Sequence, residues 1–354
     1  MSGPSVNCAA NIVVVGAGPA GLAAAIHARQ LGLTVTLLER QRFPRHKPGE
    51  TLHPGAESVL TRLGVSAPIV RASTARHEGI SVAWGDRSQS SFHGAEAGVL
   101  WRGFQIRRKH FDLILLNHAV ALGVDVYQPC RAERLLLEGE QVVGVETDFG
   151  SIRSPYVIDA TGGQSPLFRR LGLGICAKSP TLIASYGYCA GALPGLLQAP
   201  RMLGGALGWS WIAQVSPKLV GWVRLSFDGA FQRRKPAELD PLEDIGTARG
   251  ADVTWRRASQ LAFPGYYVVG DAAAQLDPAS SHGVLRALMT GMMASYQIHQ
   301  VAAGTTSPTT AAKRYGCWVV EWWERDAAAL ASLYRQIVPD WPSMLLKQDR
   351  ISHG

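Results

Sequence analysis

The chain has 354 residues and a formal net charge of +8, and its length permits one large domain or two smaller ones with a sizeable core. Its five cysteines include no C-x-x-C pair, which argues against a zinc ribbon, a dithiol redox centre or any metal site. The basic residues are dispersed, so we expect no nucleic acid partner. No apolar run is long enough for a leader or a membrane span, which predicts a cytoplasmic protein without membrane contact.

The first forty residues predict a strand, a glycine turn, a helix and a second strand. Residues 11–15 and 34–38 are apolar and β-branched, and residues 19–31 form an alanine-rich helical segment. The turn reads Gly-Ala-Gly-Pro-Ala-Gly, the pattern that lets backbone approach a pyrophosphate at a helix N-terminus. Glu39 ends the second strand and is placed to accept hydrogen bonds from a ribose. The predicted residues of this adenosine-side site are Gly16, Gly18, Ala20, Gly21, Glu39 and Arg40.

The rest of the chain alternates helical and extended patterns. Glycines end two predicted helices, and turns at 138–139 and 149–150 separate three short strands that predict a β-meander. Alternating aromatic and valine residues over 180–228 predict a second sheet on the substrate side. In chain order the remaining elements are a helix at 57–63, a strand at 79–84, a helix at 106–122, the meander at 134–160, a surface loop at 232–240, a strand at 266–269, a helix from about 283 and a helix at 308–335.

Two further strands end in motifs that could hold a long cofactor, namely Asp159-Ala160-Thr161-Gly162 and Gly270-Asp271. With the glycine turn, they resemble the FAD-dependent monooxygenase and halogenase superfamily, typified by p-hydroxybenzoate hydroxylase, tryptophan halogenases and geranylgeranyl reductases, over about residues 11–300. The resemblance implies FAD as the cofactor, reduced by NAD(P)H or another reductant. It also implies that Gly270 and Asp271 bind the ribityl or pyrophosphate region, and that Arg108, in R-x-x-F-D, lies near the phosphates.

Two segments resemble those that border the flavin ring in that superfamily. Residues 277–283 resemble its D-P-x-x-G-x-G turn, with Pro278, Ser281 in place of the first glycine, and Gly283 opening a helix whose N–H groups would face the ring. Residues 47–55 resemble its G-E-S/T-x-x-P segment, which implies that Lys47 and Gly49 contact the cofactor. The candidate catalytic residues are Glu50, His53 and His282, the histidines being able to relay a proton or to orient an indole N–H.

The sequence departs from the halogenase pattern at two places. Trp209-Ser210-Trp211-Ile212 resembles W-x-W-x-I-P, but Ala213 and Gln214 replace its last two residues. Alignment on Gly49, Glu50 and Trp84 puts Ile80 where halogenases have their catalytic lysine, which makes chlorination a minor hypothesis. Trp209, Trp211 and Trp222 are predicted to stack an aromatic substrate, the alternative being ordinary sheet core.

No second dinucleotide motif follows a strand, so nothing marks a separate NAD(P)H domain. The combined motifs look most like LodB-like flavoproteins of tryptophylquinone biogenesis. This resemblance implies a monooxygenase that hydroxylates a tryptophan, free or in a polypeptide, through a C4a-hydroperoxyflavin, with a flavin reductase as a further partner. The open alternatives are a halogenase-like or geranylgeranyl-reductase-like oxidoreductase and a non-enzymatic FAD-binding maturation partner.

The resemblance implies an α/β fold: a glutathione-reductase-type FAD-binding Rossmann domain, with a parallel sheet and a β-meander, an inserted antiparallel-sheet substrate domain and C-terminal helices. The predicted FAD-binding domain is discontinuous and comprises 1–75, 105–172 and 263–302. The substrate domain comprises 76–104 and 173–262, and residues 303–354 form the C-terminal helical segment.

Overall fold

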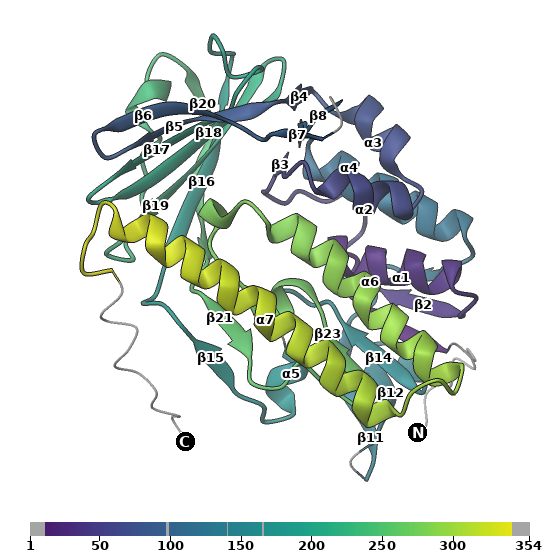
Figure 1. The fold of residues 1–354 in the computed structure, drawn as a ribbon. Helices are drawn as coiled ribbons and strands as arrows, with labels where there is room; N and C mark the ends of the chain where they lie inside the picture. Colours follow the sequence, from purple (N-terminus) through teal and green to yellow (C-terminus); the bar gives the residue numbers. More distant parts are fainter. Residues whose placement is uncertain (1–10, 97–98, 140, 165, 342–354) are drawn as a thin grey trace.

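The computed structural model describes residues 11–96, 99–139, 141–164 and 166–341, and its first layer is a six-stranded sheet (Figure 1). Five strands are parallel and the sixth is antiparallel. Short runs such as Ile-Val-Val-Val of β1, buried on both faces, suit a parallel sheet covered on both sides. In order across the sheet the strands are β10 (Asp125–Tyr127), β2 (Val35–Leu38), β1 (Ile12–Val15), β14 (Tyr156–Asp159), β23 (Tyr266–Val268) and β22 (Ala262–Phe263).

Helix α1 (Pro19–Gln30) packs against strands of this sheet, and α4 (Arg108–Ala121) and α6 (Gly283–Ala302) pack against α1. α1 begins with a proline in its first turn and continues with alanines, a composition that favours a helix. Two short helices and two small sheets lie between β2 and α4 in the chain. The helices are α2 (Ala56–Arg62) and α3 (Ser66–Ala72). One sheet comprises β3 (Thr51–Leu52), β9 (Gly103–Gln105) and β4 (Ala75–His77), and the other comprises β7 (Ala95–Glu96) and β8 (Val99–Leu100).

The second layer is a seven-stranded sheet in which every neighbouring pair is antiparallel except β17 and β5. The predicted antiparallel sheet thus contains one parallel pair. Its order is β20 (Glu243–Asp252), β16 (Ile183–Ala190), β19 (Leu219–Ser226), β18 (Gly208–Ser216), β17 (Arg201–Gly205), β5 (Gly79–Trp84) and β6 (Arg87–Phe92).

The predicted β-meander is present, and a further small sheet connects the two layers. The meander comprises β11 (Ala132–Glu138), β12 (Gln141–Thr147) and β13 (Gly150–Arg153). The connecting sheet comprises β15 (Ile175–Ala177), β21 (Arg256–Ala258) and β24 (Ala274–Gln275). The remaining short elements are α5 (Pro166–Arg170), η1 (Ala237–Leu239), η2 (Gly270–Ala272) and η3 (Pro278–Ser280).

The long helix α7 (Pro308–Arg335) runs from the parallel-sheet layer to the seven-stranded sheet (Figure 1). Ser307 caps its N-terminus by accepting a hydrogen bond from the Thr310 amide, and a proline occupies the first turn. At its other end the Tyr334 ring stacks on Trp84 of β5 and contacts Phe227. α7 therefore packs against both layers, and it lies within residues 303–354, which the sequence assigned to a separate C-terminal segment.

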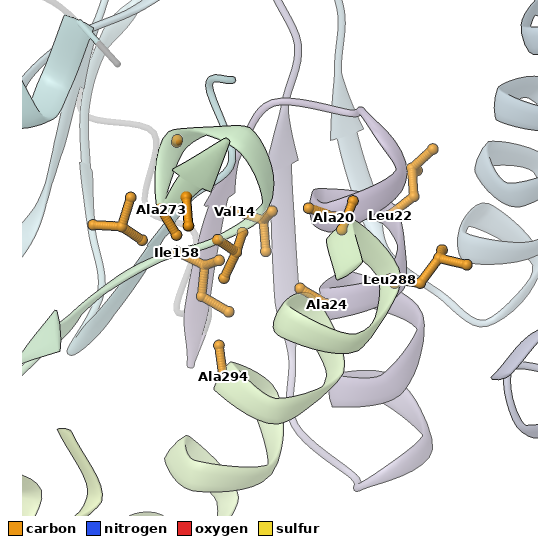
Figure 2. Close-up of a cluster of buried hydrophobic side chains, with 14 of the residues drawn as sticks. Val14, Ala20, Leu22, Ala24, Ile158, Ala273, Leu288 and Ala294 are labelled. Atoms are coloured by element: carbon orange, nitrogen blue, oxygen red, sulfur yellow. The ribbon is translucent and has the colours of Figure 1, made fainter. Parts of the chain in front are cut away.

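The closest helix contact in the core joins α6 to α1. A Cβ at Gly291 would lie 2.1 Å from the Ala20 carbonyl oxygen and 2.9 Å from the Ala24 amide nitrogen, so only glycine allows this approach. The Ser295 hydroxyl donates to the Ala24 carbonyl at 2.8 Å. Buried alanine, valine, leucine and isoleucine side chains of the two helices and of β1 and β14 form one hydrophobic cluster around this contact (Figure 2). This contact brings the start of α6 to the glycine turn.

The predicted α/β fold class is confirmed, and most predicted elements agree with the structure within one to three residues at each end. Besides shorter elements such as β10 and α5, the sequence missed α3, β6 and β20, because these segments are short or polar and show no clear hydrophobic period. The domain boundaries stay a prediction, and residues 1–10 and 342–354 of the predicted segments lie outside the described part of the chain. No helix in the described residues is long and apolar enough to cross a membrane.

We predict that Gly291→Ala lowers the free energy of unfolding by about 2–3 kcal/mol, because the new methyl group overlaps backbone of α1. Thermal and urea unfolding measure this change. Met289→Ala, at an exposed position of the same helix, is the matched control and should change stability far less. Equal stability of the two variants would contradict the close contact.

Candidate functional site

The glycine turn after β1 forms an open cradle. Gly16 has φ +106°, and a Cβ there would lie 2.4 Å from the Ala160 carbonyl oxygen. A Cβ at Gly21 would lie 1.8 Å from the Gly16 carbonyl oxygen. At Gly18, by contrast, a Cβ would have only Arg45 within 4 Å, at 3.9 Å. Gly16 and Gly21 are thus required by packing, whereas Gly18 leaves room for a ligand beside the N-terminus of α1.

Glu39 lies beside this cradle and is almost fully buried. One carboxylate oxygen accepts the Ala17 amide at 2.9 Å and the other accepts the Gln41 amide at 2.9 Å. Each oxygen keeps a lone pair that a ribose hydroxyl could use. The predicted neighbour Arg40 is exposed next to it.

Arg45 is the residue of this cradle that the sequence reasoning missed. Its guanidinium donates to the Ala17 carbonyl at 2.8 Å and lies 3.8 Å from Glu39 and 3.7 Å from Asp112. Its Nε is buried without a hydrogen-bond partner among the described residues. A buried cation with a spare donor beside an open cradle suits a diphosphate. Nothing in the local sequence separates Arg45 from the exposed arginine at position 42.

Arg108 holds the loop that follows β2. It makes a bidentate ion pair with the buried Asp112, at 2.9 and 3.0 Å, and donates to the Pro48 carbonyl at 3.1 Å. Gly49, next to that carbonyl, has φ +100°, which favours glycine. The predicted Arg108 thus anchors the 47–50 segment. Lys47 in this segment is half-buried, and burial together with Arg45 lowers its pKa.

The predicted flavin-end residues lie where β23 and α6 approach the cradle. Gly270 has φ +61°, and a Cβ there would lie 2.8 Å from the Ala20 Cβ. The Asp271 side chain beside it is exposed. Gly283 opens α6, and a Cβ there would meet no atom within 4 Å. Space is therefore available at both the carboxylate and the helix N-terminus.

Ser281, in the turn that precedes α6, is the one non-glycine residue with positive φ, +56°, among the described residues. This left-handed conformation explains why the superfamily pattern has glycine there. The turn is held by the wholly buried Asp277, which accepts hydrogen bonds from the Ala279 amide at 2.9 Å and the Trp255 indole at 2.6 Å. Burial raises the pKa of Asp277 to about 6.

Tyr334 of α7 completes the support of this turn. Its hydroxyl donates to Asp277, at 2.8 and 2.9 Å from the two carboxylate oxygens, and accepts the Trp209 indole N–H at 2.8 Å. All three side chains are buried. A chain of hydrogen bonds thus connects the C-terminal helix to the turn and to one predicted substrate residue, a connection with no signal in local sequence.

A cavity of about 330 Å³ lies between the 278–282 turn, the 48–53 segment and the seven-stranded sheet. It is the size of a small ligand site and brings most predicted substrate and catalytic residues together. Aromatic and aliphatic side chains form most of its wall. The predicted residues that line it are Gly49, Glu50, His53, Trp209, Trp211, Trp222, Pro278, Ser281 and His282.

Glu50 is the one carboxylate among the described residues that line this cavity. One of its oxygens accepts the Tyr188 hydroxyl at 2.5 Å and the other accepts the Gly49 amide at 2.9 Å. Burial and the neighbouring Glu50 charge raise the pKa of Tyr188, so the phenol keeps its proton. The Glu50 carboxylate is therefore positioned as a hydrogen-bond and proton acceptor in the cavity.

The three predicted tryptophans do not share one face of the sheet. Trp211 pairs with Val223, whereas Trp222 pairs with Ile212, so Trp222 points to the face opposite Trp209 and Trp211. Trp222 belongs to a second, smaller core and its ring covers Gly187, where a Cβ would lie 2.6 Å away. Trp222 and Gly187 line both this cavity and a second cavity of about 400 Å³.

The residues fit FAD, with the spare donor of Arg45 and the open Gly18 cradle on the adenosine side. Glu39 would hold the ribose, the α1 N-terminus and Arg45 the diphosphate, and Asp271 and the α6 N-terminus the flavin end. The flavin end adjoins the aromatic cavity, so the arrangement can bring a bound ring against the redox cofactor.

Relatives of known activity include halogenases and a reductase. The chain is 26% identical to the tryptophan 2-halogenase of Chondromyces crocatus, over 91% of this chain and 67% of that protein. It is 27% identical to a 1H-pyrrole-2-carbonyl-[peptidyl-carrier protein] brominase of Pseudoalteromonas luteoviolacea, over 83% and 78%. It is 28% identical to menaquinone reductase of Mycobacterium tuberculosis, over 88% and 82%.

Solved structures with the same fold include the flavin-dependent brominase Bmp2, with a TM-score of 0.76 and 24% identity over 96% of this chain and 92% of that one. A geranylgeranyl bacteriochlorophyll reductase-like protein from Thermoplasma acidophilum has a TM-score of 0.78 and 21% identity over 92% and 88%. These likenesses show the fold.

The relatives overturn the interpretation that the enzyme hydroxylates tryptophan. Halogenases and a reductase are similar to this chain over most of its length, and none of the relatives described above is a LodB-like protein. One missing lysine and a few short motifs indicate the reaction less well than similarity along the whole chain does. These motifs serve the flavin, which the whole superfamily shares, and carry little information on the substrate.

We predict that Arg45→Met lowers the affinity for FAD by roughly 10- to 100-fold, because charge-assisted hydrogen bonds to the diphosphate are lost. Flavin fluorescence titration of the apoprotein measures this affinity. Arg42→Met, on the exposed part of the same loop, is the matched control and should bind FAD like the unmodified protein. Unchanged affinity in the Arg45 variant would remove this residue from the phosphate site.

We predict that the protein loses stability as pH falls from about 6.5 to 4, partly through His77. Burial lowers the pKa of His77 to about 4, so the unfolded chain takes up the proton first and stability is lost on acidification. Urea unfolding measures the free energy of unfolding at pH 7 and at pH 4. Between these two pH values it should fall by about 3 kcal/mol less in His77→Asn than in the unmodified protein. Replacement of the exposed His110 should alter the fall much less, and an equal fall in all three proteins would contradict the prediction.

A family model described as "FAD binding domain" matches residues 9–311. This match covers the glycine turn, the sheet, the cavity and α6. The chain therefore belongs to the FAD-binding domain family and is a flavin-dependent enzyme of the oxidoreductase type.

Proposed function

We propose that this chain is a flavin-dependent halogenase-like oxidoreductase that acts on an electron-rich aromatic ring. The observation that carries the proposal is the 330 Å³ aromatic cavity beside the flavin end, with Glu50 as its carboxylate. Similarity to a tryptophan halogenase and a pyrrole brominase supports it. The proposal takes up the halogenase alternative that the sequence left open.

The overall reaction consumes reduced FAD, oxygen, a hydrogen halide and an aromatic C–H, and yields FAD, the aryl halide and two waters. FAD, when bound and reduced, supplies the electrons that reduce oxygen. The ring carbon that gains the halogen loses a proton, and Glu50 is positioned to accept it. Trp211 and Tyr186 would hold the ring, and apolar side chains such as Val223 would exclude water.

A reductase is the second candidate, favoured by Ile80. This isoleucine lines the cavity at the position where the halogenase resemblance implies the catalytic lysine, and no lysine lines the cavity among the described residues. Reduction of a double bond needs an electron source and a proton donor but no such lysine. Similarity to menaquinone reductase is consistent with this candidate.

We expect the FAD-loaded protein, supplied with NADH, a separate flavin reductase, oxygen and bromide, to brominate one or more compounds in a panel of phenols, pyrroles and indoles. Mass spectrometry identifies the product by the paired bromine isotopes. Glu50→Gln should retain FAD and lower kcat by roughly 100-fold, because the proton acceptor is lost.

Omission of bromide is the control and should abolish the mass shift. Oxygen consumption without a halogenated product would contradict halogenation. Anaerobic, halide-independent reduction of a quinone or isoprenoid double bond would establish the reductase in its place.

A further inference from the structure

His53 lies at the centre of a row of histidines that line the cavity. Its ring centroid is 4.7 Å from that of His282 and 6.2 Å from that of His93. His93 continues the row to His77, with Nε2 and Nδ1 of the two rings 3.1 Å apart. His53 follows β3, His93 follows β6, His282 precedes α6 and His77 ends β4, so the row exists only in the folded chain.

The hydrogen position on His53 is fixed by a backbone contact. The Gly55 amide lies 3.0 Å from Nδ1 of His53. A backbone N–H can only donate, so Nδ1 must offer its lone pair to it. In the neutral ring the hydrogen then lies on Nε2. With Nδ1 turned to the backbone, Nε2 is the nitrogen left to face the cavity that the ring lines.

The surroundings of His53 keep the ring neutral. Burial, followed by the neighbouring His282 and His93, lowers its pKa to about 4. His282 in turn faces Asp326 and Arg286, which pair with each other on α7 and α6. No lysine, arginine or aspartate is among the described residues that line the cavity, and its one carboxylate, Glu50, accepts the Tyr188 hydroxyl. His53 therefore stays a neutral donor near pH 7.

Several other polar groups of the cavity cannot select a ligand in this way. The indole N–H groups of Trp209 and Trp211 are directed to Tyr334 and, at 3.3 Å, to Thr51. The hydroxyls of Tyr186 and Ser281, which also line the cavity, can either donate or accept. A neutral imidazole with its second nitrogen occupied can only donate, so His53 distinguishes an acceptor from a donor on the ligand.

We propose that Nε2–H of His53 recognises a hydrogen-bond-accepting oxygen, carbonyl or phenolic, on the aromatic substrate. This inference rests on the proposed function, because it takes the ligand of the cavity to be an aromatic substrate. It narrows that substrate class to rings that carry an oxygen substituent. An unsubstituted indole or pyrrole, whose N–H needs an acceptor, leaves this donor unsatisfied at a cost.

The test measures binding to the FAD-loaded protein without halide or reductant, using 2-acetylpyrrole and 2-ethylpyrrole as a matched pair. Calorimetric titration should show a roughly 3- to 10-fold preference for the acetyl compound in the unmodified protein. His53→Leu should abolish the preference. His53→Gln, whose amide N–H can reach the place of Nε2, should restore part of it, and His110→Leu, exposed on α4, should leave it unchanged.

Nitrogen NMR of histidine-labelled protein gives an independent readout of the hydrogen position. The proposal expects a hydrogen on Nε2 and not on Nδ1 of His53 from pH 7 down to about pH 5. The proposal is overturned if the hydrogen lies on Nδ1 or if His53→Leu keeps the preference for 2-acetylpyrrole. It is also overturned if His53→Leu weakens the binding of FAD and leaves the binding of the pyrroles unchanged, because the donor would then serve the flavin. Since neither measurement involves turnover, failure of halogenation and failure of this inference are separate outcomes.

Discussion

The close approach of α6 to α1 is the contact on which both halves of the site depend. At Gly291 the backbone of α1 lies so close that a side chain would overlap it. Gly270, which follows β23, likewise lies close to the side chain of Ala20. Segments that are 250 residues or more apart in the chain are thereby placed to face one cofactor. Without this packing the glycine turn could still hold an adenosine diphosphate, but no helix N-terminus would lie at the flavin end.

A second set of contacts determines the shape of the cavity. The carboxylate of Asp277 receives hydrogen bonds from Trp255 and Tyr334, and Tyr334 receives one from Trp209. Because all four side chains are buried, loss of any one would leave a polar group unpaired. The C-terminal helix is thus part of the site's support, although it contributes none of the predicted cofactor or substrate residues.

The site combines a cofactor part built from backbone and a substrate part built from side chains. The cofactor part depends on glycines and helix N-termini, which tolerate little change and are shared by enzymes with different reactions. The substrate part is a wall of the seven-stranded sheet, to which Ile80, Trp211 and Tyr186 contribute side chains. This division explains why flavin motifs identify the family but do not identify the reaction.

The sequence by itself determined the adenosine-side site, the long helices and the α/β class, because a strand, a glycine turn and a helix within thirty residues, or a helical period over several turns, are local patterns. Only the tertiary structure decided that Arg45 is buried at the cradle, that Asp277 is bound by Tyr334, and that four histidines form a row. It also decided the face of Trp222, which depends on strand register. These features arise from contacts between residues distant in the chain, whose partners are set by sheet register and helix packing and leave no mark in local spacing.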